Sequence, residues 1–121
     1  MTKRILVVED QEDNRQILRD LLGSSGYEFV EAEDGAQAIA AVAKQRPDLI
    51  LMDIQLPNMD GYEATRRIRS NPDNKTIPII AVTSYALAGD EGKAIEAGCD
   101  AYVAKPFSPR QLLAKIREYL P

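Results

Sequence analysis

The chain has 121 residues, 45% of them hydrophobic, with a formal net charge of −4 and an isoelectric point near 4.8. The length suits one domain with its own core, so we predict a single domain over residues 1–121. The acidic balance argues against a nucleic-acid-binding surface and favours a cation or a protein partner. Histidine is absent and Cys99 is the single cysteine, which excludes a histidine-based triad, a histidine metal site and an internal disulfide.

From the sequence we expect neither a membrane span nor a signal peptide. The longest apolar stretches fall well short of the roughly 20 residues that a spanning helix needs. Acidic residues follow the first apolar run at once, which is typical of a strand rather than a secretory leader. Cys99 is expected to be a small buried side chain in a reducing compartment. We therefore expect a soluble, cytoplasmic protein.

Apolar runs typical of strands alternate with segments of helical periodicity along the whole chain. The expected strands are residues 3–8, 28–32, 49–53, 77–82 and 101–104. The expected helices are residues 13–24, a segment that opens at Asp34, a segment that opens at Asp60, about residues 87–97, and a last segment from Ser108 to about Leu120.

Local signals mark several helix ends. Gly23 and Gly26 are predicted to stop the first helix. The capping-box pattern occurs three times, at Asp34–Gln37, Asp60–Glu63 and Ser108–Gln111.

Two glycines, Gly89 and Gly92, fall in the helix expected over residues 87–97. An interior glycine costs about 1 kcal/mol relative to alanine, so we predict that the first turn of this helix is the softest helical segment. Amide exchange as slow there as in the last helix would contradict this. The alternative is that Gly89 merely precedes the helix.

Five strand–helix units in this length predict an α/β fold, a parallel five-stranded sheet with helices on both faces. The size suits a doubly wound, flavodoxin-like (βα)5 sheet. The sequence does not display strand order, but for a flavodoxin-like sheet we expect the order 2-1-3-4-5. If the order is 2-1-3-4-5, the switch point lies between the first and third strands, and ligands bind beyond the carboxyl ends of the strands there.

Residues that carry chemistry follow four of the five expected strands. Glu9-Asp10, Asp53, Thr83-Ser84 and Lys105-Pro106 stand at the ends of the first, third, fourth and fifth strands. Three carboxylates so close together repel unless a cation joins them. Mg²⁺ suits such oxygen ligands and leaves room for a phosphate, and one Mg²⁺ with Lys105 balances the three carboxylates in formal charge.

A phosphoryl group fits this arrangement. Asp53 is a candidate nucleophile that forms an acyl phosphate. Mg²⁺, the Lys105 ammonium and the Thr83 hydroxyl would each meet a phosphoryl oxygen, and the small Ser84 would leave the oxygens reachable.

Each of these residues also has an ordinary reading when taken alone. Asp53 could begin a turn after its strand, and Glu9-Asp10 could cap a helix. Thr83-Ser84 could be a common turn, and Lys105 could be solvated. Together, at four predicted strand ends, these residues are hard to explain as an accident.

Four blocks of sequence, ILVVED, PDLILMDIQLPNMDGYE, IPIIAVTSYA and GCDAYVAKPF, resemble the receiver domain of bacterial two-component response regulators in content and order. The resemblance runs from about Lys3 to Leu120. It implies that Asp53 is the phosphoacceptor. It also implies that Asp10 binds Mg²⁺ directly, that Glu9 acts largely through water, and that the Gln55 backbone carbonyl is a further ligand.

The same resemblance assigns roles around the phosphoacceptor. Thr83 would be the switch hydroxyl, Tyr102 the aromatic side chain that rotates, and Lys105 the family's lysine, joined to Pro106 by a cis peptide bond. Gln55 and Tyr85 would occupy the two positions that tune the lifetime of the phosphoryl group.

The resemblance further implies a signalling role rather than an enzyme with an external substrate, although the domain would assist its own phosphorylation and dephosphorylation. The phosphoryl donor would be a phosphohistidine of a histidine kinase or a histidine phosphotransfer protein. A downstream protein would bind the face formed by the helix over 87–97, the strand 101–104 and the last helix, which shifts between two states. We expect a monomer, with dimerisation through this face on phosphorylation as the alternative.

The last helix ends the chain, so we expect no output domain and a stand-alone receiver of the DivK kind. A receiver excised from a hybrid histidine kinase remains the alternative origin.

Three other classes compete with this interpretation. A haloacid-dehalogenase-type phosphatase requires a second aspartate where Gln55 stands. A flavodoxin-like cofactor binder requires a glycine- or hydroxyl-rich loop where residues 9–12 are mostly acidic. A metal-free docking module leaves Lys105 and Thr83 unexplained.

Overall fold

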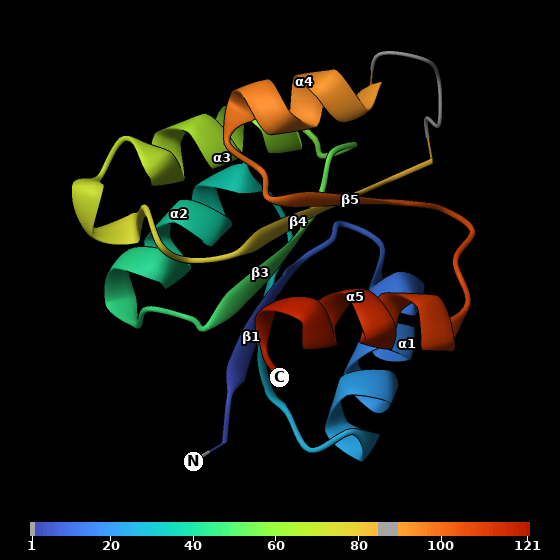
Figure 1. Ribbon diagram of the computed structural model, residues 1–121. Helices are drawn as coiled ribbons and strands as arrows, with labels where there is room; N and C mark the ends of the chain where they lie inside the picture. The colour runs from blue at the N-terminus through green and yellow to red at the C-terminus, as the bar shows by residue number, and fades with distance from the viewer. Residues whose placement is uncertain (1, 85–89) are drawn as a thin grey trace.

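The computed structural model describes residues 2–84 and 90–121, and strands alternate with helices along these ranges (Figure 1). The strands are β1 (Arg4–Val8), β2 (Glu28–Ala32), β3 (Leu49–Asp53), β4 (Ile79–Thr83) and β5 (Ala101–Ala104). The helices are α1 (Glu12–Ser24), α2 (Gly35–Lys44), α3 (Gly61–Arg69), α4 (Asp90–Ala97) and α5 (Pro109–Tyr119), with a short 3-10 helix, η1 (Pro72–Asn74).

The five strands form one parallel sheet in the order β2-β1-β3-β4-β5. This confirms the predicted flavodoxin-like architecture and its strand order. β1 lies between β2 and β3, and Val8 near its end is in register with Met52 on β3. The chain therefore reverses its direction of winding between β1 and β3, and the carboxyl ends of these two strands stand side by side.

Helices cover both faces of the sheet: α1 and α5 lie on one face, and α2, α3 and α4 lie on the other (Figure 1). Neighbouring strand residues point to opposite faces, so Ile5 and Val7 pack toward α1 and α5 while Leu6 and Val8 pack toward the other layer. Each strand of the centre is thus buried on both sides, which explains the unbroken apolar runs in the sequence.

Two predicted boundaries shifted for local reasons. β4 begins at Ile79, not at residue 77, because the preceding Pro78 lacks an N–H group, although its carbonyl still accepts a hydrogen bond from Ile50 (2.9 Å). Gly23 lies inside α1 rather than ending it. The chain turns instead at Gly26, whose φ of 86° is the conformation that glycine tolerates best. Gly89 lies outside the described residues.

Three helices begin with the predicted capping side chains. Ser108 and Gln111 form both bonds of a capping box at the start of α5. Asp34 and Asp60 each accept from the backbone N–H three residues on. The Glu63 side chain, however, pairs with Arg67 (2.9 Å) instead of reaching back to the chain.

A buried cysteine precedes the fifth strand. Cys99, just before β5, is buried and lies 3.8 Å from the Thr65 hydroxyl. Its place in the buried core cluster confirms its expected role as a small core side chain, and the same burial raises the pKa of the Cys99 thiol. In the described ranges, no helix is both long enough and apolar enough to cross a membrane.

Candidate functional site

Three carboxylates meet at the carboxyl ends of β1 and β3. Glu9 and Asp53 are only 2% and 4% exposed, and Asp10 is half-buried. One oxygen of each carboxylate lies within 4.8 Å of the others. Carboxylates this close in a buried place need a cation, and an all-oxygen donor set is the type that Mg²⁺ prefers. The residues present therefore fit a magnesium ion.

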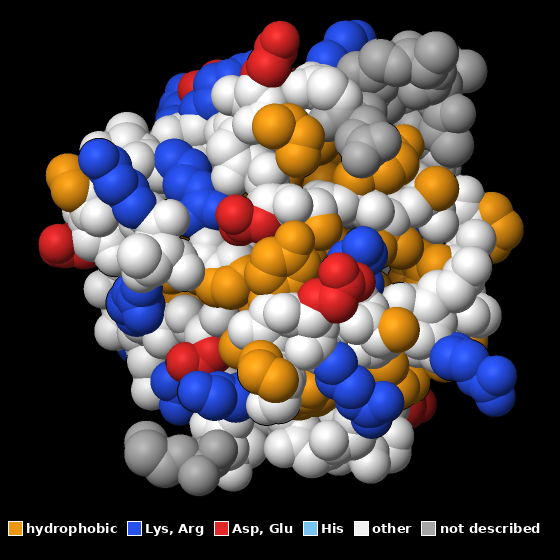
Figure 2. Space-filling model, viewed as in Figure 1, with side chains coloured by type: hydrophobic (Ala, Val, Ile, Leu, Met, Phe, Trp, Pro, Cys, Tyr) orange, Lys and Arg blue, Asp and Glu red, His pale blue; other side chains and the backbone are white. Residues whose placement is uncertain are grey.

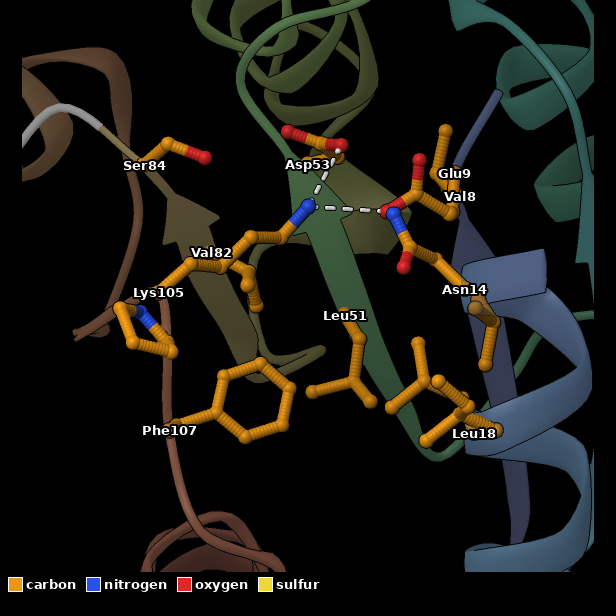
Figure 3. A pocket seen from close by; sticks show the side chains of 13 residues that line it. Val8, Glu9, Asn14, Leu18, Leu51, Asp53, Val82, Ser84, Lys105 and Phe107 are labelled. Carbon is orange, nitrogen blue, oxygen red and sulfur yellow. Dashed lines mark hydrogen bonds and ion pairs between the residues drawn. The ribbon is translucent and has the colours of Figure 1, made fainter. Parts of the chain in front are cut away.

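Lys105 joins two of these carboxylates. Its Nζ donates to Glu9 Oε1 (2.9 Å) and to Asp53 Oδ2 (3.1 Å), and Figure 3 shows the ammonium between them. Burial lowers the pKa of the Lys105 ammonium, but its hydrogen bond to Glu9 and the charges of Asp53 and Glu9 outweigh burial and raise that pKa. Lys105 is therefore a fixed positive charge at neutral pH, not the solvated lysine of the ordinary reading.

The second oxygens of the carboxylates bind the backbone. Asp53 Oδ1 accepts from the Gln55 N–H (2.9 Å), so Asp53 does begin a turn as well as facing Lys105. Glu9 Oε2 accepts from the Gln11 N–H (3.0 Å). Gln11, not Glu9 or Asp10, is the N-cap residue of α1, and its own side chain makes no capping hydrogen bond. The reading of Glu9-Asp10 as a simple helix cap is therefore wrong.

The remaining predicted residues surround this centre unevenly. Thr83 ends β4 and is 1% exposed, whereas Ser84 is exposed. Tyr102 lies on the neighbouring strand, in register with Ala81, and packs half-buried against the core beside α2, α3 and α4. Gln55 is half-buried, and its side-chain carbonyl accepts from the Ser84 N–H (3.4 Å). Tyr85 lies outside the described residues.

The loop after β5 brings Lys105 into place. The Lys105 N–H donates to the Thr83 carbonyl (2.7 Å), which extends the pairing of β5 with β4 by one step. The Lys105–Pro106 peptide bond is cis. The hydrogen bond to Thr83 places Lys105 directly beside the end of β4, in reach of Asp53.

A cavity of about 600 Å³ opens beside the carboxylates, between α1 and the loop after β5. Its wall near the site carries Glu9, Asp53 and Lys105, and its deeper wall is apolar, with Leu51 and Phe107 among its side chains (Figure 3). The charged groups thus stand at the polar margin of an apolar hollow that reaches the surface along α1.

Two residues at this site were missed by the sequence reasoning. A Cβ on Gly61 would lie 2.3 Å from the Asp53 carbonyl oxygen, so only glycine allows α3 to start so close to the end of β3. Arg15 is buried and donates to the Glu9 carbonyl. It lies three residues before Leu18 on the inward side of α1, and a charge on an apolar stripe is a signal that could have identified it.

The model of the response regulator receiver domain matches residues 5–117. Over 120 residues the chain is 42% identical to the polar-differentiation response regulator DivK of Brucella abortus, covering 99% of this chain and 98% of that protein. The DivK protein of Brucella melitensis shows the same identity and coverage.

Solved structures show the same fold. The receiver domain of a sensor histidine kinase from Pseudomonas aeruginosa, which holds a magnesium ion in its active-site cleft, is 40% identical with a TM-score of 0.91 and covers 99% of this chain and 98% of that one. The chemotaxis protein CheY4 of Vibrio cholerae is 29% identical with a TM-score of 0.93, at 98% and 99% coverage. This chain belongs to the response regulator receiver family of two-component signalling.

Proposed function

We propose that this DivK-like receiver accepts a phosphoryl group on Asp53 in a Mg²⁺-dependent reaction. The donor is a phosphohistidine of a histidine kinase or a histidine phosphotransfer protein. One observation carries the proposal: a buried aspartate shares a lysine with a second buried carboxylate, and Asp10 completes an acidic trio beside them. A surplus of buried negative charge at a sheet switch point is suited to a cation and a phosphate together.

The transfer conserves atoms and charge in a simple way. An oxygen of the Asp53 carboxylate attacks phosphorus, the P–N bond to the donor imidazole breaks, and an acyl phosphate forms. The bond electrons leave with the imidazole, which then takes a proton. The Lys105 ammonium, already 3.1 Å from Asp53, balances charge on the phosphoryl oxygens without having to move far.

The metal would be held by Asp10, Asp53, the Gln55 backbone carbonyl and, through water, Glu9. When bound, Mg²⁺ neutralises negative charge on the carboxylates and on the phosphoryl oxygens. The protein's own contribution is to fix the oxygens. Glu9 and Asp53 each use one oxygen on a backbone N–H and the other on Lys105, so neither carboxylate is free to rotate.

The response to phosphorylation would pass through Thr83 and Tyr102. New acceptor oxygens on Asp53 would draw in the Thr83 hydroxyl, and Tyr102 on the adjacent strand would turn toward the space released. Gln55 and Tyr85 would set how well water reaches the acyl phosphate.

The surface that reads this change is the face made by α4, β5 and α5. In Figure 2 this face is toward the viewer, and hydrophobic side chains are scattered between the helices among charges of both signs. Ile95 on α4 is 52% exposed, and Tyr102 and Val103 on β5 are half-buried. A mixed surface of this kind suits a transient protein partner. We place the protein in the cytoplasm as a monomer that binds its target through this face.

Intact-protein mass after incubation with Mg²⁺ and acetyl phosphate tests the proposal. We expect a gain of one phosphoryl group that requires Mg²⁺. The matched control is Asp53→Asn, which keeps the size of the side chain and removes the nucleophilic carboxylate, and which should gain nothing.

Three results would contradict the proposal. One is phosphorylation of the Asp53→Asn variant to the native extent. Another is a lack of phosphorylation of the native protein both by acetyl phosphate and by phosphohistidine donors, although it is folded. The third is steady hydrolysis of an external phosphate ester, which would indicate a phosphatase instead.

A further inference from the structure

A buried guanidinium lies behind the acidic trio and has no part in the proposed chemistry. Arg15 is 7% exposed and is the only buried lysine or arginine side chain among the described residues. It lies in the first turn and a half of α1, on the side that packs against the sheet with Leu18 and Leu22. Burying a charge is costly, so a buried arginine needs several good partners.

Arg15 has partners on four segments, the turn after β1, α1 itself, β2 and the loop after β2. Its Nη1 donates to the Glu9 backbone carbonyl (2.8 Å). The rest of the guanidinium faces Glu12 on α1, Glu31 on β2 (3.4 Å) and Glu33 in the loop after β2 (3.5 Å). The side chain therefore ties the turn between β1 and α1 to the end of β2.

The Glu9 carbonyl, to which Arg15 donates, lies within the acidic site itself. It belongs to the peptide group that joins Glu9 to Asp10, the two carboxylates contributed by β1. The Glu9 N–H donates to the Ala32 carbonyl (3.0 Å) on β2, and the Glu9 side chain accepts from Gln11 and Lys105. With Arg15 on the carbonyl, every polar group of Glu9 is held, and the direction in which Asp10 leaves the strand is set.

We propose that Arg15 is a positioning residue of the phosphorylation site. Its fork of donors holds the peptide between Glu9 and Asp10 so that both carboxylates face Asp53 at the spacing a magnesium ion needs. The inference rests on the proposed function, because it assigns Arg15 a task in metal binding at that site. Groups that orient metal ligands in this way commonly change metal affinity by about tenfold or more when removed.

A purely electrostatic role and a positioning role for Arg15 predict opposite changes in Mg²⁺ affinity when Arg15 is replaced. If the guanidinium acted only as a nearby positive charge, its removal would strengthen the attraction of the acidic trio for Mg²⁺. If it positions the turn, its removal weakens Mg²⁺ binding even though the site becomes more negative. Lysine in its place keeps the charge but lacks the planar fork that reaches a carbonyl and carboxylates together.

The test compares Arg15→Gln and Arg15→Lys with Arg19→Gln. Arg19 pairs with Glu12 (3.4 Å) and Glu31 (2.7 Å), two of the same glutamates, and none of its hydrogen bonds among the described residues reaches Glu9. Magnesium dissociation constants are measured by calorimetry on unphosphorylated protein at constant ionic strength. Amide exchange of Gln11, the donor to Glu9 Oε2, is followed by NMR in metal-free protein, with core amides of β3 as the reference.

We expect Arg15→Gln and Arg15→Lys each to raise the Mg²⁺ dissociation constant by about tenfold and to speed Gln11 exchange selectively. Arg19→Gln should change neither by more than about twofold. Equal or tighter Mg²⁺ binding by Arg15→Gln, or full recovery by Arg15→Lys, would overturn the proposal. So would exchange that rises equally at Gln11 and in β3, because that marks a loss of global stability alone.

Failure of the proposed function would be visible elsewhere. It would appear in the unsubstituted protein, as a lack of both Mg²⁺ binding and phosphorylation. Failure of the positioning role would appear only in the difference between the Arg15 and Arg19 variants. The Gln11 exchange measurement needs no metal and so decides the positioning of the turn in either case.

Discussion

The two ends of the sheet each hold a largely buried cation, but the charges around them differ. At the amino end of β4, Arg69 donates to the carbonyls of Asn74 (2.7 Å), Ile77 (2.7 Å) and Gly98 (2.9 Å) and to Asp100 (2.8 Å). Asp100 in turn accepts from the Ile79 N–H (2.8 Å). One arginine thus faces one aspartate, and neutral carbonyls fill its other donors.

At the carboxyl end, three carboxylates face one ammonium. Lys105 is shared by Glu9 and Asp53, and Asp10 adds a further negative charge. A cluster with equal positive and negative charge, such as the one around Arg69, contributes to stability and needs no bound ligand. An unbalanced cluster is held in place by the fold and is completed only by a bound cation. The comparison teaches that the end proposed to bind ligands differs in its excess of negative charge and in the burial of its carboxylates, because Asp100 is exposed whereas Glu9 and Asp53 are buried.

The largest expected effect comes from Lys105→Met. In the proposed reaction the ammonium meets the transferred phosphoryl group, so its loss should lower the initial rate of phosphorylation by acetyl phosphate by about 100-fold. The rate is followed by intact mass at saturating Mg²⁺. Lys115→Met is the control, because Lys115 pairs only with exposed Glu118 among the described residues. A Lys105→Met rate close to that of the control would remove the distinction between the two ends.

Gly61→Ala should be the next most damaging change. The new methyl group would press on the Asp53 carbonyl and the Ile54 backbone, where a Cβ would lie at 2.3 Å and 2.7 Å. We expect a loss of about 2–3 kcal/mol in the free energy of unfolding, measured by urea denaturation, together with slower phosphorylation. A fully stable and fully active variant would show that the backbone at the end of β3 can shift at little cost to accommodate the methyl group.

Arg69→Met tests the balanced end. Several carbonyls and Asp100 would lose their donor, and we expect the free energy of unfolding to fall by about 2 kcal/mol. Under conditions in which the variant is folded, its rate of phosphorylation should stay within about twofold of native. A large loss of rate in a folded Arg69→Met protein would mean that this cluster also serves the site.

The smallest effect is expected for Gly23→Ala, the counterpart of Gly61→Ala. Gly23 lies in the last turn of α1, and a Cβ there would meet no described atom within 4 Å. The substitution should raise the free energy of unfolding by about 0.5 kcal/mol, because alanine favours the helix. Urea denaturation of Gly23→Ala and Gly61→Ala under the same conditions compares their free energies of unfolding. A destabilised Gly23→Ala variant would contradict the expectation that, of these two glycines, only Gly61 lacks room for a side chain.

Much of the fold could be predicted because its signals are local. Apolar runs, capping residues and spacing locate the five strands and helices within a few residues. The exceptions also have local causes, such as Pro78, which cannot donate to the ladder. Glu9, Asp10, Asp53 and Lys105 could be proposed as one site because parallel strands end at the same edge of a sheet.

Arg15, Gly61 and Arg69 could not be assigned in this way. Arg15 was not recognised because its partners outside α1 come from the turn after β1, from β2 and from the loop after β2. In the sequence Gly61 is an ordinary residue after a helix cap. Glycine is required there because α3 approaches β3 too closely to leave room for a Cβ, and this approach is seen only in the folded structure. The donors of Arg69 bind backbone carbonyls in η1 and in the turn before β5. Every residue has a backbone carbonyl, so the sequence does not indicate which ones accept from Arg69.

The sequence by itself determined the class of fold, the ends of most elements and the set of charged residues at the strand ends, because these depend on side-chain pattern and backbone direction. The tertiary structure alone decided the pairing of charges. It placed Lys105 between Glu9 and Asp53, buried Arg15 behind them and balanced Arg69 with Asp100. Electrostatic interactions act over a few ångströms between groups that are far apart along the chain, so their balance exists only once the chain has folded.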